Sequence, residues 1–453
     1  MLRTLSSINM YRSFSCLLCF LFIALHGFAQ KKKKDEDNTK DDYVSGENTL
    51  VYNDHVYKKN IATVQLHRTD LEWSSPVISL NSNIKLQLSF DDLDADAKTY
   101  GYTFIHCDAD WQPSNMLAQE YMSGFFDEQI SDRKYSMNTL QPYTHYTLQF
   151  PTENVQITKS GNYIIEVFTD YDHENFVLSK RFMVVDEKVD LDVQVKPSSN
   201  VEERNYKQEV DFVLHANNYR ITNPYEDLKV VLMQNDRWDN ALTGIKPVFV
   251  KDKELDYDLG DGNQFYGGSE FRKVDIKSLR YHTERIAAIH IDSASQRYYV
   301  DLLTDENRSA KRYTNDIDIN GRYKIYIQES KLNNETEADY IFVHFSLKAD
   351  SPDKEGMFYL FGEFTDWQYK PEFRMKYNAD EHIYECTAYI KQGYYNYEYV
   401  YLKDGSSVAS EIPAEGTHWE TENDYLVLIY NREMGTTWDQ LIAVRHKNSV
   451  RNN

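Results

Sequence analysis

Short segments in which apolar and polar residues alternate recur along most of the chain. Residues 84–90 (IKLQLSF) and 321–328 (GRYKIYIQ) are clear examples, and turn-forming residues gather between such segments. Alternation with a period of two is typical of a half-buried β-strand, and helical periodicity is nearly absent. Many short strands joined by turns predict an all-β fold made of tandem antiparallel β-sandwich domains that resemble immunoglobulin domains.

The strand-like segments fall into three groups, which we predict to be three domains. A chain of 453 residues is long enough for about three domains of ordinary size. We place the first β-sandwich domain at residues 51–186, the second at residues 187–330 and a C-terminal domain at residues 338–445. The polar residues between the last two form a predicted linker.

Residues 267–280, in the predicted second domain, have an unusual pattern. They follow a turn-rich stretch that contains several glycines and aspartates. On a strand, Arg272, Val274 and Ile276 fall on one face, whereas Phe271 and charged residues fall on the other. Because neither face is purely apolar, this segment is not a simple core strand.

This pattern leaves two interpretations open. In one, a long loop leads into an edge strand, and Arg272 forms an internal ion pair with an acid such as Glu270 or Asp275. In the other, Glu270, Phe271 and Arg272 belong to a surface that another protein recognises. We therefore take these three residues as candidates for a partner interface.

The beginning of the chain has the organisation of a secretory signal peptide at residues 1–29. Two arginines precede an apolar run of 12 residues at 14–25, and Gly27 and Ala29 form a small-x-small cleavage site. This run is shorter than the roughly 20 apolar residues that a membrane-spanning helix needs. Residues 30–50 are charged and polar, which predicts a flexible tail. We expect an exported protein without direct membrane insertion.

The charge of the chain excludes two classes of partner. The formal net charge is −22, and removing the predicted leader with its two arginines makes it −24. A surface this acidic repels phosphate backbones and anionic lipid heads, so we expect no nucleic acid as a partner. Only Cys107 and Cys386 lie outside the leader, in different predicted domains, which argues against a disulfide framework.

Three acid-rich or histidine-containing runs were considered as metal sites. The run from Asp92 to Asp96 begins like a calcium loop but lacks the glycine and the glutamate that an EF-hand requires. Residues 106–110 (HCDAD) collect ligand-type side chains without a companion cluster, which is weak for zinc. Residues 256–263 (DYDLGDGN) lack a bidentate acid at the expected spacing. We therefore predict no metal site in any of them.

Catalytic spacings are absent from the sequence. It contains no HExxH, GxSxG, P-loop or GxGxxG motif. A pair of acids for glycoside hydrolysis needs only spatial proximity, so a secreted hydrolase stays open as a hypothesis. The prediction is nevertheless a non-enzymatic protein with no catalytic residues, cofactor or metal.

Part of the predicted C-terminal domain resembles the early-set immunoglobulin-like modules related to glycogen-binding domains. The resemblance lies in residues 361–367 (FGEFTDW) and 393–400 (GYYNYEYV), followed by a KDG turn. In that family carbohydrate stacks on two tryptophans, and Trp367 matches the first. Ser406 and Ser407 stand where the second is expected. The resemblance implies the fold, and it motivates glycan binding at the cell envelope as an alternative function.

Several further stretches, spread over most of the first two predicted domains, combine turns with aromatic residues. They are residues 106–114 (HCDADWQPS), Glu120-Tyr121, Gly124-Phe125, 143–146 (YTHY), Phe150-Pro151, 160–163 (SGNY), 268–272 (GSEFR) and 278–281 (SLRY). Together they resemble the plug proteins of the type IX secretion system. The resemblance implies a non-enzymatic periplasmic protein that seals the mouth of a very large outer-membrane β-barrel translocon, with which it associates. Under this hypothesis Glu270, Phe271, Arg272 and Trp367 are candidate contact residues.

Overall fold

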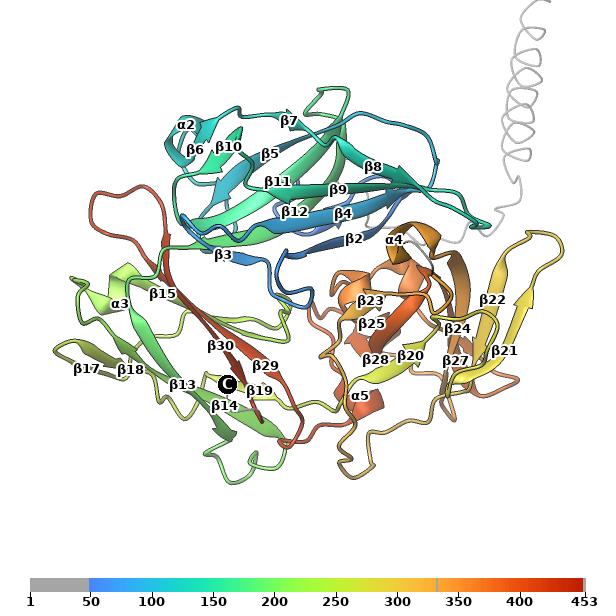
Figure 1. Ribbon diagram of the computed structural model, residues 1–453. Helices are drawn as coiled ribbons and strands as arrows, with labels where there is room; N and C mark the ends of the chain where they lie inside the picture. Colours follow the sequence, from blue (N-terminus) through green and yellow to red (C-terminus); the bar gives the residue numbers. More distant parts are fainter. Residues whose placement is uncertain (1–48, 331–332, 451–453) are drawn as a thin grey trace, which may run out of the picture. The chain divides into compact units, whose positions relative to one another are not determined.

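The computed structural model describes residues 49–330 and 333–450 and confirms the all-β prediction (Figure 1). Strands make up 45% of the structure and helices 6%. Six larger sheets form three pairs, and the two sheets of each pair share one buried core. We call these pairs the first, second and third sandwich. The predicted signal peptide at residues 1–29 and nearly all of the predicted tail lie outside the described residues.

The first sandwich pairs a sheet of order β1-β12-β11-β5-β7 with a sheet of order β2-β4-β9-β8. Leu86, Leu88 and Phe90 alternate along β4 and are fully buried, as the sequence pattern predicts. β3 adds to β12 in parallel, and β6 and β10 form a small separate ladder. The elements are β1 (His55–Val56), β2 (Ile61–Arg68), β3 (Val77–Ser79), β4 (Leu86–Asp92), β5 (Tyr100–Cys107), α2 (Ala118–Tyr121), β6 (Met122–Gly124), β7 (Glu128–Gln129), β8 (Asp132–Tyr135), β9 (Thr144–Phe150), β10 (Val155–Ile157), β11 (Gly161–Thr169) and β12 (Phe176–Val185).

The second sandwich pairs a sheet of order β13-β14-β18-β17 with a sheet of order β16-β15-β29-β30, and β19 adds to β14. Its core contains Phe212 and Tyr257, whose rings stack at a centroid distance of 4.3 Å. The elements are β13 (Asp190–Pro197), β14 (Lys207–His215), α3 (Pro224–Asp227), β15 (Leu228–Gln234), β16 (Leu242–Thr243), β17 (Phe249–Lys251), β18 (Glu254–Asp256), β19 (Gln264–Tyr266), β29 (Asp424–Asn431) and β30 (Gln440–Asn448).

The third sandwich pairs a sheet of order β20-β28-β23, to which β25 adds, with a sheet of order β21-β22-β24-β27-β26. Its core is rich in tyrosine, and Tyr395, Tyr397 and Tyr399 are all buried on β28. The elements are β20 (Arg272–Asp275), β21 (Ile286–Ile291), β22 (Tyr298–Leu302), β23 (Tyr323–Ile325), α4 (Asn334–Glu337), β24 (Tyr340–Lys348), β25 (Gly356–Phe361), η1 (Glu363–Thr365), η2 (Pro371–Phe373), β26 (Lys376–Asn378), β27 (Ile383–Lys391), β28 (Gly393–Lys403) and α5 (Ile412–Glu415).

The strand pairing differs from the grouping that the sequence predicts, and it corrects two assignments. Strands β20 to β23, expected in the domain at 187–330, belong to sheets of the third sandwich. Strands β29 and β30, expected in the domain at 338–445, complete the second sandwich by pairing with β15. Alternation reveals which face of a strand is buried but not which strand lies beside it. β15 pairs with β16 at two residue pairs, and it pairs with β29 over its full length, although β29 lies almost 200 residues later in the chain.

Buried polar groups connect the three sandwiches. Lys391 of the third sandwich lies 2.5 Å from Asp91 of the first, and both side chains are only 1% exposed. Tyr340 donates a hydrogen bond to the same carboxylate. Further ion pairs between sandwiches are Lys180–Asp366 (2.9 Å), Arg432–Asp108 (2.7 Å), Arg322–Asp424 (3.1 Å) and Arg237–Glu398 (3.3 Å). Within the described residues, no helix is both long and apolar enough to cross a membrane.

Candidate functional site

The segment 267–280 forms an edge strand, and its alternation is as predicted. β20 lies at one end of its sheet and pairs only with β28. Arg272, Val274 and Ile276 are buried, whereas Lys273 and Asp275 are half-buried. The strand ends at Asp275, where the backbone leaves the sheet except for one hydrogen bond from Ile276 N to Gly393 O.

Arg272 lies inside the third sandwich, with a side chain only 8% exposed. Its Nε donates to Glu415 at 2.9 Å and its Nη1 donates to Asp305 at 2.9 Å. The guanidinium also lies over the ring of Tyr399, at 5.2 Å from the centroid. Arg308 donates a second charge-assisted hydrogen bond to Glu415 at 2.8 Å. We call these five residues the Arg272 cluster; the ion pair expected with Glu270 or Asp275 is formed with Glu415 and Asp305 instead.

The electrostatics of the Arg272 cluster are those of a closed ionic network. Burial alone would raise the pKa of the Glu415 carboxyl, but the charges of Arg272 and Arg308 hold it below its usual value. Asp305 also accepts hydrogen bonds from the hydroxyls of Tyr397 and Tyr399, at 2.9 and 2.8 Å. Each nitrogen of the Arg272 guanidinium thus donates a hydrogen bond within the chain, to Glu415, Asp305 or the carbonyl oxygen of Glu306.

Glu270 and Phe271, the other candidate contact residues on this segment, are also buried, at 4% and 5% exposure. Glu270 accepts a hydrogen bond from the hydroxyl of Tyr313 at 2.6 Å, and burial raises the pKa of its carboxyl. Phe271 N donates to Asp318, whose pKa burial and the nearby Glu270 raise to about 7. The structure thus brings Glu270, Phe271 and Arg272 together, but beneath the surface.

Trp367 packs against the same region from the other side. Its ring lies 6.0 Å from that of Phe271 and 5.4 Å from that of Phe361, measured between centroids. The guanidinium of Arg237 lies over it at 5.7 Å. A Cβ added to Gly321 would lie 2.2 Å from the Trp367 ring, so the backbone of that glycine touches the tryptophan. Trp367 is half-buried and packs against the small cluster that contains Phe361, so its ring is used in packing within the chain.

In the first sandwich, side chains of the two candidate metal-binding runs, residues 92–96 and 106–110, bind other groups of the chain. Lys98 Nζ lies 2.9 Å from Asp92 and 3.5 Å from Asp96, so a lysine already balances these acids. His106 hydrogen-bonds Ser114 at 2.9 Å and the carbonyl oxygen of Ser160 at 3.2 Å. Burial lowers the pKa of His106 to about 4, so the imidazole is neutral at physiological pH.

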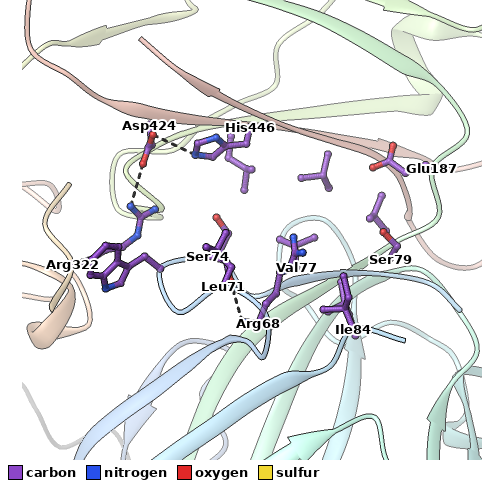
Figure 2. Close-up of a pocket in the computed structure, with 16 residues that line it drawn as sticks. Arg68, Leu71, Ser74, Val77, Ser79, Ile84, Glu187, Arg322, Asp424 and His446 are labelled. Carbon is purple, nitrogen blue, oxygen red and sulfur yellow. Dashed lines mark hydrogen bonds and ion pairs between the residues drawn. The ribbon is translucent and has the colours of Figure 1, made fainter. Parts of the chain in front are cut away.

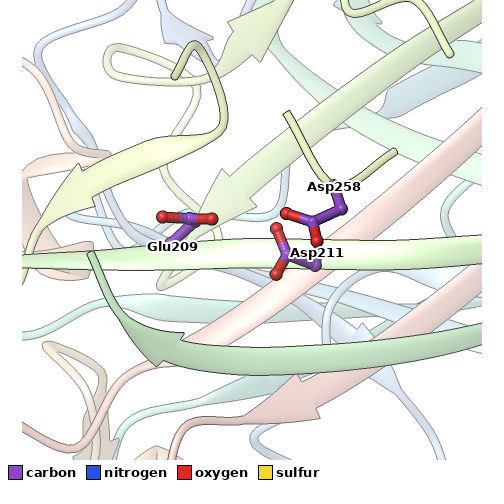
Figure 3. A group of neighbouring side chains, drawn as sticks. All are labelled: Glu209, Asp211 and Asp258. Carbon is purple, nitrogen blue, oxygen red and sulfur yellow. The ribbon is translucent and has the colours of Figure 1, made fainter. Parts of the chain in front are cut away.

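The third run joins a larger group of acids that the sequence does not bring together. Asp258 lies close to Glu209 and Asp211 of β14, with ligand atoms of the three within 4.8 Å of one another (Figure 3). Lys196 Nζ lies 2.5 Å from Asp211, 3.3 Å from Glu209 and 3.5 Å from Asp258. Because the ammonium group already occupies the centre of these carboxylates, the group is an ion-pair network. Sequence reasoning missed Glu209 and Asp211 because they lie about 50 residues before the loop.

A cavity of about 440 Å³ lies between residues 68–84 of the first sandwich and one face of β29 and β30. Figure 2 shows its wall of apolar side chains, among them Leu71, Val77 and Ile84. At one end Asp424 meets Arg322 at 3.1 Å and His446 at 3.4 Å. Burial would raise the pKa of Asp424, but the hydrogen bond from His446 and the charge of Arg322 hold it far below its usual range.

This cavity has one element of a hydrolytic site but not the rest. His446 and Asp424 form a histidine–carboxylate pair, and the hydrogen bond to Asp424 raises the pKa of His446. Two serines also line the cavity, Ser74 and Ser79. Among the described residues, however, no hydrogen bond joins His446 to a hydroxyl group, as nucleophilic catalysis by a serine requires. The pair instead helps to join the second sandwich to Arg322 of the third.

Comparisons with known proteins place these features in context. Residues 61–186 match the family profile described as "Type 9 secretion system plug protein 1st domain". The fold is similar to the crystal structure of a hypothetical protein from Parabacteroides merdae ATCC 43184, with a TM-score of 0.85 and 32% sequence identity. That similarity covers 88% of this chain and 100% of the other. No curated protein matches the chain.

Proposed function

Because this chain belongs to the same family as the Parabacteroides merdae protein, and because residues 61–186 match the plug protein first domain, we propose that it is a non-enzymatic subunit of the type IX secretion system. In this role it closes the periplasmic opening of the large outer-membrane β-barrel translocon while no cargo is in transit. The family match over the first sandwich is the observation that carries the proposal.

The packing of the three sandwiches into one unit supports a role in closing a pore. A protein that closes a wide pore has to keep its shape, and the described residues belong to one compact unit. Its sandwiches are joined by buried pairs such as Lys391–Asp91, whose separation leaves a charge without its partner. Such pairs resist sliding of one sandwich against another.

Export and docking complete the proposal. The signal peptide predicted at residues 1–29 delivers the protein to the periplasm, where it associates with the outer membrane through the translocon. The net charge of −24 that remains without the leader steers it toward a basic rim of the barrel, and salt then weakens the complex. We also propose that the third sandwich, which contains residues 361–367 and 393–400 of the predicted domain at 338–445, is an early-set immunoglobulin-like domain.

Affinity purification tests the proposal. The tagged protein is isolated from gently solubilised envelopes at low and at high salt, with a tagged periplasmic β-sandwich protein of another family as the control. We expect one very large outer-membrane barrel in an amount comparable to the bait, and less of it at high salt. Recovery of the bait alone would contradict the proposal.

A permeability assay tests the sealing itself. Cells that lack the protein should admit a large hydrophilic antibiotic that an intact outer membrane excludes, and the wild-type gene should restore exclusion. Unchanged exclusion in the deletion strain, with the barrel present, would reject the sealing role. Binding of a soluble glucan that is lost in Trp367→Ala would support the glycan-binding alternative instead.

A further inference from the structure

Two neighbouring loops of the first sandwich carry exposed aromatic side chains. Residues 123–129 include the connection from β6 to β7, and residues 169–175 include the connection from β11 to β12. Phe125 is 64% exposed, Phe126 is 43% exposed and Tyr171 is 66% exposed. His173 Nε2 lies 3.3 Å from the carboxylate of Asp127, so the two loops meet. We call them the aromatic loops.

The backbone of the first aromatic loop is fixed although its phenylalanine rings are exposed. Phe125 N donates to Asn154 O at 2.9 Å, and Thr103 donates to Phe126 O at 2.7 Å. Gly124 has a φ of +97°, and a Cβ there would lie 1.9 Å from Asn154 O, so only glycine permits this turn. A fixed backbone that presents large apolar rings loses little freedom when a partner covers them.

The second aromatic loop presents its tyrosine through a left-handed turn. Asp170 and Tyr171 have φ values of 59° and 56°. The left-handed conformation is uncommon for a bulky residue such as tyrosine, and unusual backbone conformations of this kind gather at recognition sites. The turn is closed by hydrogen bonds from Asp172 N to Thr169 O and from Asn175 N to Asp172 O. This loop is therefore also a formed structure.

The charges around the rings indicate the kind of partner. Residues 123–129 and 169–175 contain five acids and no lysine or arginine. Asp127, Asp170, Asp172 and Glu174 are exposed, whereas Glu128 is half-buried and accepts hydrogen bonds within the chain. Exposed carboxylates repel an anionic lipid surface, and they repel the same loops of a second copy of the chain. A protein surface with an apolar pocket and a rim of lysine and arginine complements both features.

We propose that the aromatic loops are the docking surface for a protein partner, with the Phe125 and Tyr171 rings in an apolar pocket of that partner and the acids facing a basic rim. The inference rests on the proposed function only for the identity of the partner, which would be the translocon barrel.

Site-specific photo-crosslinking in the native cell tests the surface. A photoreactive phenylalanine analogue replaces Phe125 in the full chain, and Phe249 on β17, which is 62% exposed, serves as the matched control position. We expect a protein adduct at 125 and at least about tenfold less at 249, as for an anchor at the centre of an interface. The partner's crosslinked peptide, identified by mass spectrometry, should adjoin lysine or arginine residues. Absence of an adduct at 125, or equal yields at both positions, would overturn the proposal.

Charge reversal separates this inference from the proposed function. The double substitution Asp127→Lys with Asp172→Lys should lower the adduct yield at 125 about tenfold or more, because the basic rim then faces like charge. An unchanged yield would reject the basic rim. The adduct at 125 could instead contain a protein other than the barrel, with a yield that the charge reversal lowers. That result would support the docking surface and reject the barrel as its partner.

Vesicle flotation tests the lipid alternative. Vesicles of phosphatidylethanolamine and phosphatidylglycerol are mixed with the full-length mature protein and with the Phe125→Ser/Phe126→Ser variant. We expect neither protein to float. Flotation of the wild type that the variant loses would show that these rings enter a membrane, and it would overturn the protein partner.

Discussion

The Arg272 cluster and the aromatic loops have opposite relations to solvent. Arg272 belongs to a segment of mixed charged and apolar residues, and all of its charged contacts lie within the chain, at Glu415 and Asp305. Phe125 and Tyr171 are apolar, and the folded chain leaves most of their surface uncovered. The contrast teaches that mixed polarity along a strand does not identify an interface. An interface is identified instead by apolar surface that the folded chain leaves exposed to solvent.

The largest expected effect is on stability and comes from breaking the Arg272 cluster. Arg272→Met leaves two buried carboxylates with fewer partners, which should lower the free energy of unfolding by about 3 kcal/mol. The matched control is Lys273→Met on the same strand. Lys273 pairs with Asp316 at 2.5 Å near the surface and should contribute less than about 1 kcal/mol. Chemical denaturation measures the free energy of unfolding of both variants. Equal losses in the two would show that the buried ion pairs of Arg272 stabilise the fold no more than the surface pair of Lys273.

The second effect is a pH dependence that arises next to the Arg272 segment. The pKa of Asp318 is about 7 in the folded protein, because of burial and the nearby Glu270, against 3.8 ordinarily. A raised pKa means that the folded state binds the proton more tightly, so this stabilisation is complete below pH 3.8 and is lost as the pH rises to about 7. Between pH 5 and pH 8 the wild type should lose about 2 kcal/mol relative to Asp318→Asn.

Denaturation of wild type and Asp318→Asn in parallel at several pH values measures that difference. Titrating groups that do not interact with Asp318 are common to both proteins and cancel in the comparison. A difference that is constant from pH 5 to pH 8 would show that Asp318 titrates as an ordinary surface acid, and it would argue that the segment 267–280 is more open to water than the structure has it.

The smallest expected effect on stability belongs to the aromatic loops. Phe125→Ser removes a side chain that is 64% exposed, so the free energy of unfolding should change by less than about 0.5 kcal/mol. Recovery of the barrel in an affinity purification should nevertheless fall about tenfold or more. A variant that is strongly destabilised would show that the rings support the fold, and the reduced recovery would then have no bearing on docking.

The features that the sequence predicts correctly are those that depend on local pattern, such as which face of a strand is buried. The alternation along β4 and β20 identifies the buried faces, because the side-chain period of a strand is fixed. It does not identify Glu415 as the partner of Arg272, because the two residues are 143 positions apart. For the same reason it places β29 and β30 in the wrong sandwich.

The first aromatic loop has a local signal in the sequence. The run Ser123-Gly124-Phe125-Phe126-Asp127 sets two adjacent aromatics between a glycine and acids, which is turn chemistry and not strand alternation. Two large apolar residues in a turn have no predicted sheet face on which to be buried. Apolar residues outside the alternating segments therefore indicate the exposed surface better than charged residues within those segments do.

Hydrogen–deuterium exchange of the protein alone and in its translocon complex tests the central claim most directly. In the free protein, β20 should already be protected, because its amides lie in a buried ladder with β28. On docking, protection should increase at residues 123–129 and 169–175 and stay unchanged at 267–280. An increase at 267–280, with the aromatic loops unchanged, would contradict the account and restore the Arg272 segment as the contact surface.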